Sequence, residues 1–282
     1  MQEVWMPRLF LPVLTYPTPT AFAGLLRALD LAATLQGEVS ATIVEVDIPP
    51  VSAPLVPMGV DVTAMSMEAE AVSRRQANEA AAHLRNEARR IGLTIAVDRI
   101  RRRQEWAGTA LASAARSQDL TLLVMGDSDD ERRVAEALIF ESGGPVVLIP
   151  GAGETPTHLS TVAVAWDDSA ASARALRDAM PMLEAADRVV LLTADADKKI
   201  DPKSIERALA ALDHRGIQNS HLEVLVESGQ SIGDALQQAA LRKDAGLLVM
   251  GAFGHSRIRE FILGGATRSV LGKLQMAILM SH

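Results

Sequence analysis

The chain has 282 residues, of which 48% are hydrophobic and 22% charged, so it can bury a sizeable core and wholesale disorder is excluded. Its net charge of -7 argues against a general nucleic-acid binder, and the absence of cysteine excludes disulfides, thiolate metal sites and a cysteine nucleophile. No segment approaches the ~18 to 20 apolar residues that span a bilayer, and the N-terminus lacks a signal-peptide pattern, so we expect a soluble, cytoplasmic protein without a membrane partner.

Strands and helices alternate through the first half of the chain. Runs rich in Val, Ile and Thr favour strands, whereas apolar residues at helical spacing favour amphipathic helices. We predict strands over residues 8–15, 38–46, 93–99, 119–126 and 145–150, and helices over residues 21–36, 66–90, 105–117 and 129–141. Residues 47–65 contain four prolines and are predicted to be an irregular surface loop, with a lid or an oligomer contact as the alternative.

The same succession begins again after a linker-like segment, GAGETPTHL, at residues 151–159. We predict strands over residues 161–166, 188–193, 220–226, 245–251 and 277–280, and helices over residues 169–185, 202–215, 232–241 and 267–274. DLTLLVMG at residues 119–126 parallels DAGLLVMG at residues 244–251. This similarity indicates an internal duplication.

Alternating strands and helices are typical of parallel βαβ units with helices on both faces of the sheet. We therefore predict an α/β fold of two tandem, doubly wound, five-stranded parallel sheets, in domains 1–150 and 160–282. In such sheets, ligands bind beyond the carboxyl ends of the strands, where the strand order reverses. The first and fourth strands of each half are expected to be neighbours at that point.

The second half places glycines and a carboxylate at this position. Its fourth strand ends at Gly251 and is followed by Gly254, Gly264 and Gly265, where a predicted helix begins. Glycines before a helix N-terminus let backbone amides approach an anion, so the segment reads as a phosphate cradle. Asp167 follows the first strand and suits an exocyclic amine or a ribose hydroxyl. The alternative is that Asp167 caps the following helix.

These residues resemble a universal stress protein domain, whose adenine-nucleotide-binding members share the motif G-x2-G-x9-G-(S/T). Here the motif falls on Gly251, Gly254 and Gly264, and VAWDDS at residues 164–169 resembles the start of such a domain. The resemblance implies a tandem, two-domain member with a Rossmann-like fold of the adenine-nucleotide α-hydrolase-like group. It implies a nucleotide site made by Asp167, Ala194, Met250, Gly251, Gly254, His255, Gly264, Gly265, Ala266 and Thr267.

Both halves depart from the family pattern. Gly265 stands where the motif has Ser or Thr, so backbone amides remain and Thr267 is the nearest hydroxyl. In the first half, the segment after Gly126 is DSDDERR, with no second glycine at the required spacing. Its acids would repel a triphosphate, and we favour a solvated helix start over a Mg²⁺ site for them. One nucleotide site per chain is therefore predicted, in the second half.

The sequence favours binding over catalysis. It contains no G-x-S-x-G, H-E-x-x-H or G-x4-G-K-[ST] motif. We expect a stress-response module that binds ATP, with or without Mg²⁺, and reports its occupancy to an unknown protein partner. The alternatives are an adenylate-forming or slowly ATP-hydrolysing enzyme and a nucleotide-free structural protein. The resemblance also implies that the fifth strands of the halves pair within the chain as a pseudo-dimer, and it allows a homodimer.

Overall fold

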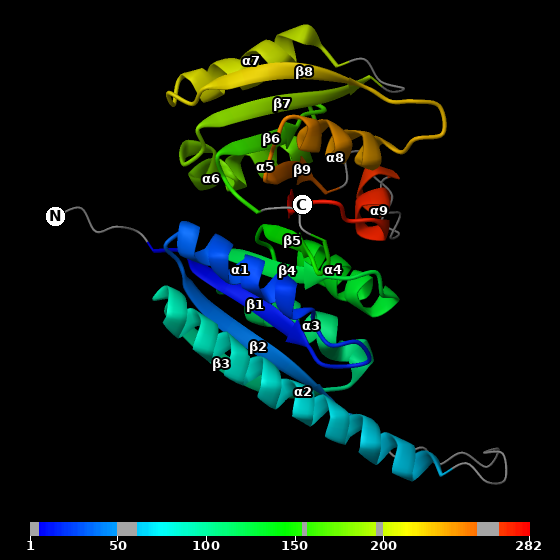
Figure 1. Ribbon diagram of the computed structural model, residues 1–282. Helices are drawn as coiled ribbons and strands as arrows, with labels where there is room; N and C mark the ends of the chain where they lie inside the picture. Colours follow the sequence, from blue (N-terminus) through cyan, green and yellow to red (C-terminus); the bar gives the residue numbers. More distant parts are fainter. Residues whose placement is uncertain (1–5, 50–60, 154–156, 196–199, 253–264) are drawn as a thin grey trace.

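The computed structural model describes residues 6–49, 61–153, 157–195, 200–252 and 265–282. These residues form a single ten-stranded sheet with the order β3-β2-β1-β4-β5-β10-β9-β6-β7-β8 (Figure 1). Each half of this order is the predicted five-stranded unit, with the first and fourth strands adjacent. The α/β fold and the expected reversal of strand order are confirmed.

The elements follow the predicted succession. In the first half they are β1 (Arg8–Leu14), α1 (Phe22–Thr34), β2 (Glu38–Val46), α2 (Val62–Ile91), β3 (Ile95–Arg102), α3 (Gln104–Ala115), β4 (Leu120–Met125), α4 (Asp129–Glu141) and β5 (Val146–Pro150). In the second half they are β6 (Thr161–Ala165), α5 (Ala170–Asp178), α6 (Met180–Glu184), β7 (Arg188–Asp195), α7 (Pro202–Asp213), β8 (Asn219–Leu225), α8 (Ile232–Arg242), β9 (Leu247–Gly251), α9 (Gly265–Gly272) and β10 (Ile278–Ser281).

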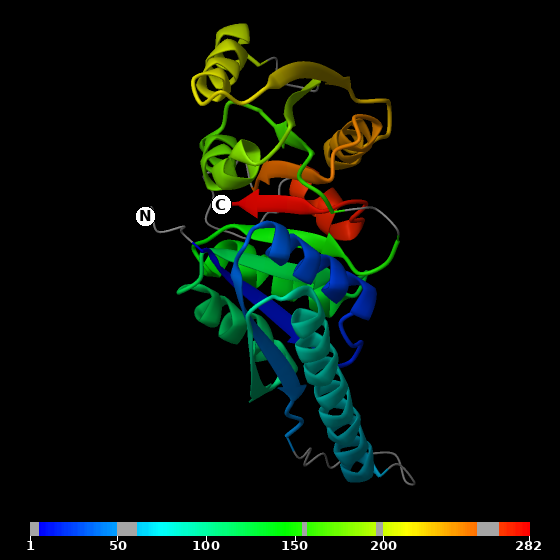
Figure 2. The same cartoon turned by 60° about the vertical axis from the view of Figure 1, so that its left-hand side comes forward.

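The halves join through their fifth strands. Neighbouring strands are parallel within each half, but β5 and β10 pair antiparallel, with Leu279 opposite Val147. Figure 2 shows red β10 lying along green β5 in the middle of the molecule. The predicted intramolecular pairing of the fifth strands is therefore present, and it makes one continuous sheet.

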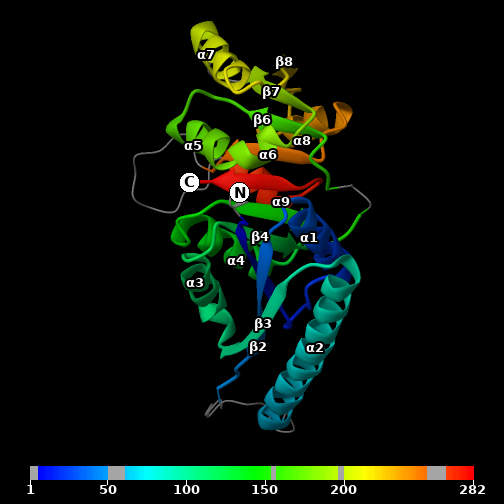
Figure 3. The same ribbon diagram turned by 90° about the vertical axis from the view of Figure 1, so that its left-hand side faces the viewer.

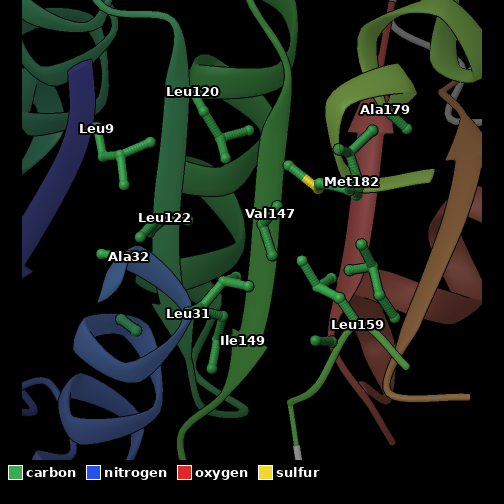
Figure 4. Packing of buried hydrophobic residues seen from close by; sticks show 14 of the residues in the cluster. Leu9, Leu31, Ala32, Leu120, Leu122, Val147, Ile149, Leu159, Ala179 and Met182 are labelled. Atoms are coloured by element: carbon green, nitrogen blue, oxygen red, sulfur yellow. The ribbon is translucent and has the colours of Figure 1, made fainter. Parts of the chain in front are cut away.

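Helices cover both faces of this sheet. One buried apolar cluster packs α1, α2, α5, α6 and α7 against one face, and a second packs α3, α4, α8 and α9 against the other. Both clusters contain residues of both halves, and Figure 4 shows Leu159 and Met182 of the second half in the same cluster as Val147 and Ile149 of the first. The two halves therefore share their core.

Two of the helix predictions depart from the structure by more than two residues, those of α2 and of the segment 169–185. α2 begins at Val62, because the Asp61 side chain accepts a hydrogen bond from Ala64 N at 2.9 Å and caps the helix there. The predicted loop over residues 47–65 therefore extends too far, and its residues 50–60 lie outside the described residues. The single helix predicted over residues 169–185 is wrong. It breaks into α5 and α6 because Pro181, in the first turn of α6, cannot continue the hydrogen bonds of α5.

Polar contacts hold α2 to the carboxyl ends of β1 and β2. Thr15 Oγ1 donates to Val44 O at 2.6 Å and also bonds to Ser73 Oγ, which accepts from Val46 N at 2.9 Å. Glu70 accepts hydrogen bonds from Ile48 N at 3.0 Å and from the Arg101 guanidinium at 2.6 Å. These two donors hold the pKa of the Glu70 carboxyl below its usual value.

In the described ranges, no helix combines the length and apolar character that a bilayer crossing requires.

Candidate functional site

The carboxyl ends of three neighbouring strands converge at one edge of the second half. β6 lies between β7 and β9, with Val164 opposite Leu191 on one side and Val249 on the other. Asp167 follows β6, Ala194 lies near the end of β7, and Gly251 ends β9. The structure thus brings together three of the predicted site residues that come from distant parts of the chain.

Asp167 has a local structural contact at this edge. Its Oδ1 accepts a hydrogen bond from Ser169 N at 3.0 Å, and the side chain is only half-buried. The N-cap of α5 is Ser169, whose Oγ accepts from Ser172 N at 3.0 Å. Asp167 therefore supports the turn before the cap, and within the described residues its Oδ2 takes no hydrogen bond.

The neighbouring Asp168 reaches a different element. It adopts a left-handed conformation with φ 61°, and its carboxylate accepts a hydrogen bond from the Ser204 hydroxyl. Ser204 Oγ in turn accepts a hydrogen bond from Trp166 Nε1 at 3.0 Å. This network fastens the β6–α5 turn to the first turn of α7, so Asp168 is not a helix cap.

Gly251 is required by packing as well as by its place in the motif. A Cβ atom at this position would lie 2.5 Å from Ala171 C and 2.6 Å from Ser172 N, in the first turn of α5. Glycine therefore allows β9 to approach the helix that follows Asp167. Its neighbour Met250 is only 4% exposed and belongs to the core cluster that packs α8 against the sheet.

The last predicted site residues, from Gly265 to Thr267, lie in the first turn of α9. Gly265 is exposed, with none of the described residues within 4 Å of an added Cβ, and Ala266 is half-buried. Thr267 is 2% exposed, so its hydroxyl would have to be uncovered before it could reach a phosphate. The predicted residues Gly254, His255 and Gly264 lie outside the described residues.

At the corresponding edge of the first half, side chains of the chain itself bind the N-terminus of α4. Ser128 Oγ accepts from Glu131 N at 3.2 Å, and the Glu131 carboxylate accepts from Ser128 N at 3.2 Å, which makes a capping box at the start of α4. Glu131 is 5% exposed, and its Oε2 would lie 3.0 Å from a Cβ on Gly126. A buried carboxylate thus lies beside Gly126, the residue that matches Gly251 in the duplication.

Two other acids of this segment, Asp129 and Asp130, are also paired. Asp129 and Arg132 form an ion pair at 2.8 Å, and Asp130 is bound by Gln104 and Arg133. The interpretation of a solvated helix start holds for Asp129 but is wrong for Glu131, since the capping box draws that side chain inward. Across the described ranges, no group of three metal-ligating side chains is found.

The sequence did not predict a cavity of about 240 Å³ in the first half. It lies at the carboxyl ends of β1 and β2, with α3 and α4 in its wall, and none of the predicted nucleotide-site residues lines it. Gly108 on α3 and Ala137 on α4 lie in its wall, and a Cβ on Gly108 would be 2.9 Å from Ala137 Cβ. Small residues on consecutive helices were the one sequence signal of this close approach.

Comparisons with known proteins identify a family match for the second half of the chain and similar folds for nearly all of it. Residues 158–282 match the universal stress protein family. The chain resembles a universal stress protein from Archaeoglobus fulgidus with a TM-score of 0.72 and 14% identity, over 98% of this chain and 96% of that one. It also resembles a functionally unknown protein from Pseudomonas aeruginosa, with a TM-score of 0.54 and 15% identity over 96% of this chain and 92% of that one. At these identities the likeness concerns the fold. No curated protein matches the chain.

Proposed function

Through residues 158–282 the chain belongs to the universal stress protein family, and from this premise we propose that it is a regulatory module with one adenine-nucleotide site, in its second half. The site uses Asp167, Ala194, Gly251 and the segment that leads into α9. In this proposal, residues 160–282 form the nucleotide-binding domain, and residues 1–150 form a copy of it that has lost the motif.

One observation carries the proposal. Asp167 follows β6, Gly251 ends the adjacent parallel strand β9, and Gly251 opens the spacing Gly251-x2-Gly254-x9-Gly264. The Oδ2 of Asp167, which takes no hydrogen bond from the described residues, can accept one from the exocyclic amine of adenine while Oδ1 holds Ser169 N. The glycine segment supplies backbone amides to the phosphates, and the N-terminus of α9 adds a partial positive charge.

The same residues favour binding over rapid catalysis. Gly265 provides no hydroxyl, and Thr267 is buried, so the phosphates rely on backbone amides. Mg²⁺ would enter with the nucleotide, because the described residues offer no cluster of three ligands to hold it beforehand. ATP is thus the proposed ligand, with or without Mg²⁺, and a protein partner reads its occupancy.

Isothermal titration of ATP against wild type and Gly254→Glu tests the site. A carboxylate placed in the phosphate loop repels the triphosphate, so we expect binding to wild type and none to the variant. Gly272→Glu is the matched control, since it adds the same charge at an exposed position of α9 with none of the described residues within 4 Å of its Cβ. Equal binding by wild type and Gly254→Glu, or no binding by wild type, refutes the proposal.

Asp167→Asn tests how the base is recognised. Asparagine keeps an oxygen for Ser169 N but removes the charge, and hydrogen bonds to charged groups contribute about 1.5–3 kcal/mol. We expect ATP to bind roughly 10- to 100-fold more weakly, while the affinity for inorganic triphosphate stays unchanged. An equal loss for both ligands would mean that Asp167 acts only through the fold of the turn.

A further inference from the structure

The cavity of the first half is a candidate ligand site in its own right. It occupies the carboxyl edge of β1 and β2, which the duplication relates to the edge of β6 and β7 beside Asp167. All the residues that line it belong to the described part of the chain. Figure 3 shows α3 and α4, which close it, on the side of the sheet opposite α1 and α2.

The inner wall of the cavity is apolar. Leu14, Val44, Val46, Ala107 and Val134 form it, and each is between 5% and 7% exposed. Such residues would be fully covered in a closed core, so their residual exposure is onto the cavity. The hydroxyl of Thr15, at the same wall, is already hydrogen-bonded to Val44 O and Ser73 Oγ, so it needs no hydrogen bond from a ligand. The interior therefore suits an apolar group.

The mouth of the cavity is acidic. Four carboxylates and two guanidinium groups line it, which leaves a formal charge of -2 (Glu105, Asp130, Glu136, Glu141, Arg102 and Arg133). Asp130 and Arg133 are bound to each other, so they cancel. Among the described residues, Glu105, Glu136 and Glu141 have no ion-pair partner, and Arg102 donates only to Arg101 O, at 2.8 Å.

These charges exclude the ligand proposed for the second half. A nucleotide would bring several negative charges to a mouth that is already negative, and the buried Glu131 carboxylate lies beside Gly126 on the same side of the chain's first half. A cation is attracted instead. The volume of about 240 Å³ is below the roughly 300–1,000 Å³ typical of pockets for drug-sized ligands, so the occupant is small.

We propose that this cavity binds a small monocationic amphiphile, with an apolar body about the size of a single ring and an amine or amidine that faces the carboxylates of the mouth. The apolar body lies against Leu14, Val44 and Val134, and the cation lies near Glu105 and Glu136. The chain is then a two-ligand module in which duplicated edges take ligands of opposite charge.

Three isosteric probes test this assignment with the full chain: benzamidine, benzamide and benzoate. Binding is followed by methyl chemical shifts of labelled Ala and Val residues. We expect benzamidine to bind and to shift the methyl signals of Ala107 and Val134, benzamide to bind at least threefold more weakly, and benzoate not to bind. Equal binding of benzoate, no binding of benzamidine, or shifts confined to the second half would overturn the proposal.

A charge-neutral variant separates attraction to this mouth from general attraction to an acidic protein. Glu105→Gln/Glu136→Gln/Glu141→Gln removes the three unpaired carboxylates with almost no change of shape, and we expect at least tenfold weaker binding of benzamidine. The control Glu38→Gln/Glu79→Gln/Glu206→Gln changes the net charge equally at exposed positions outside the cavity and keeps wild-type affinity. Equal losses in both variants contradict the assignment.

A last measurement keeps the two sites distinguishable. Benzamidine is titrated in the presence of ATP and against Gly254→Glu, and its affinity is expected to be unchanged in both. A loss of benzamidine binding in Gly254→Glu would place the probe in the second half and refute the proposal. Failure of ATP to bind would leave the benzamidine result unaffected, because the cavity shares no residue with the nucleotide site.

Discussion

Gly251→Ala should destabilise the protein through a contact that the glycine motif alone does not reveal. The new Cβ would lie 2.5 Å from Ala171 C and 2.6 Å from Ser172 N, whereas ordinary contacts lie at 3.4–4 Å. β9 and the first turn of α5 must therefore separate by roughly 1 Å in a close-packed interior. Overpacking of this kind costs about 1–3 kcal/mol, and each kcal/mol lowers Tm by about 2–4 °C in a chain of this size.

Urea unfolding followed by circular dichroism measures this cost, with Gly265→Ala as the matched control. Gly265 belongs to the same motif, but an added Cβ there meets none of the described residues within 4 Å, so we expect a change within about 0.5 kcal/mol. Because the displaced turn of α5 follows Asp167, Gly251→Ala should also weaken ATP binding. An unfolding free energy of Gly251→Ala within about 0.5 kcal/mol of wild type would refute the packing argument.

Three further predictions concern the scaffold. Glu70→Gln should lower stability at pH 7 by on the order of 1 kcal/mol. Because the hydrogen bond from Ile48 N lowers the pKa of Glu70 in the folded state, this difference should be full above the unfolded pKa of about 4.3 and shrink as the pH falls below it, and a constant difference across pH 3–7 would contradict it. Leu279→Ala removes a fully buried side chain from β10, where it pairs with β5, and should lower the free energy of unfolding by about 2–5 kcal/mol. One calorimetric transition should remain, because the halves share their core; two transitions would mean that the halves unfold separately. Ser204→Ala leaves Trp166 Nε1 without its acceptor and should cost about 1–3 kcal/mol with altered tryptophan fluorescence; an unchanged spectrum and stability would show the bond to be dispensable.

Local signals predicted most of the fold. The limits of β2 and α4 are the predicted ones, because β-branched residues mark the strand and acidic residues mark the start of the helix. The start of α2 was predicted too late, since the cap at Asp61 follows a proline-rich segment. The break between α5 and α6 was missed because the apolar pattern continues through Pro181.

The candidate site was predicted less completely. The rule for doubly wound sheets was sufficient to place Asp167 beside the strand that ends at Gly251. The partner of Asp168 was not predictable, because Ser204 lies 36 residues away and meets it only when α7 packs on the sheet. The burial of Glu131 was also unexpected, since acids at a helix start are usually exposed, and here the capping box turns the side chain inward.

The sequence by itself determined the succession of elements, the parallel halves and the position of the glycine motif, because these depend on residue spacing along the chain. The pairing of β5 with β10 was expected only from the family resemblance, and only the tertiary structure decided that Gly251 is needed for contact with α5 and that α3 and α4 line an acidic cavity. These features depend on distances between elements that are far apart in the chain. Packing sets those distances, and no local pattern records them.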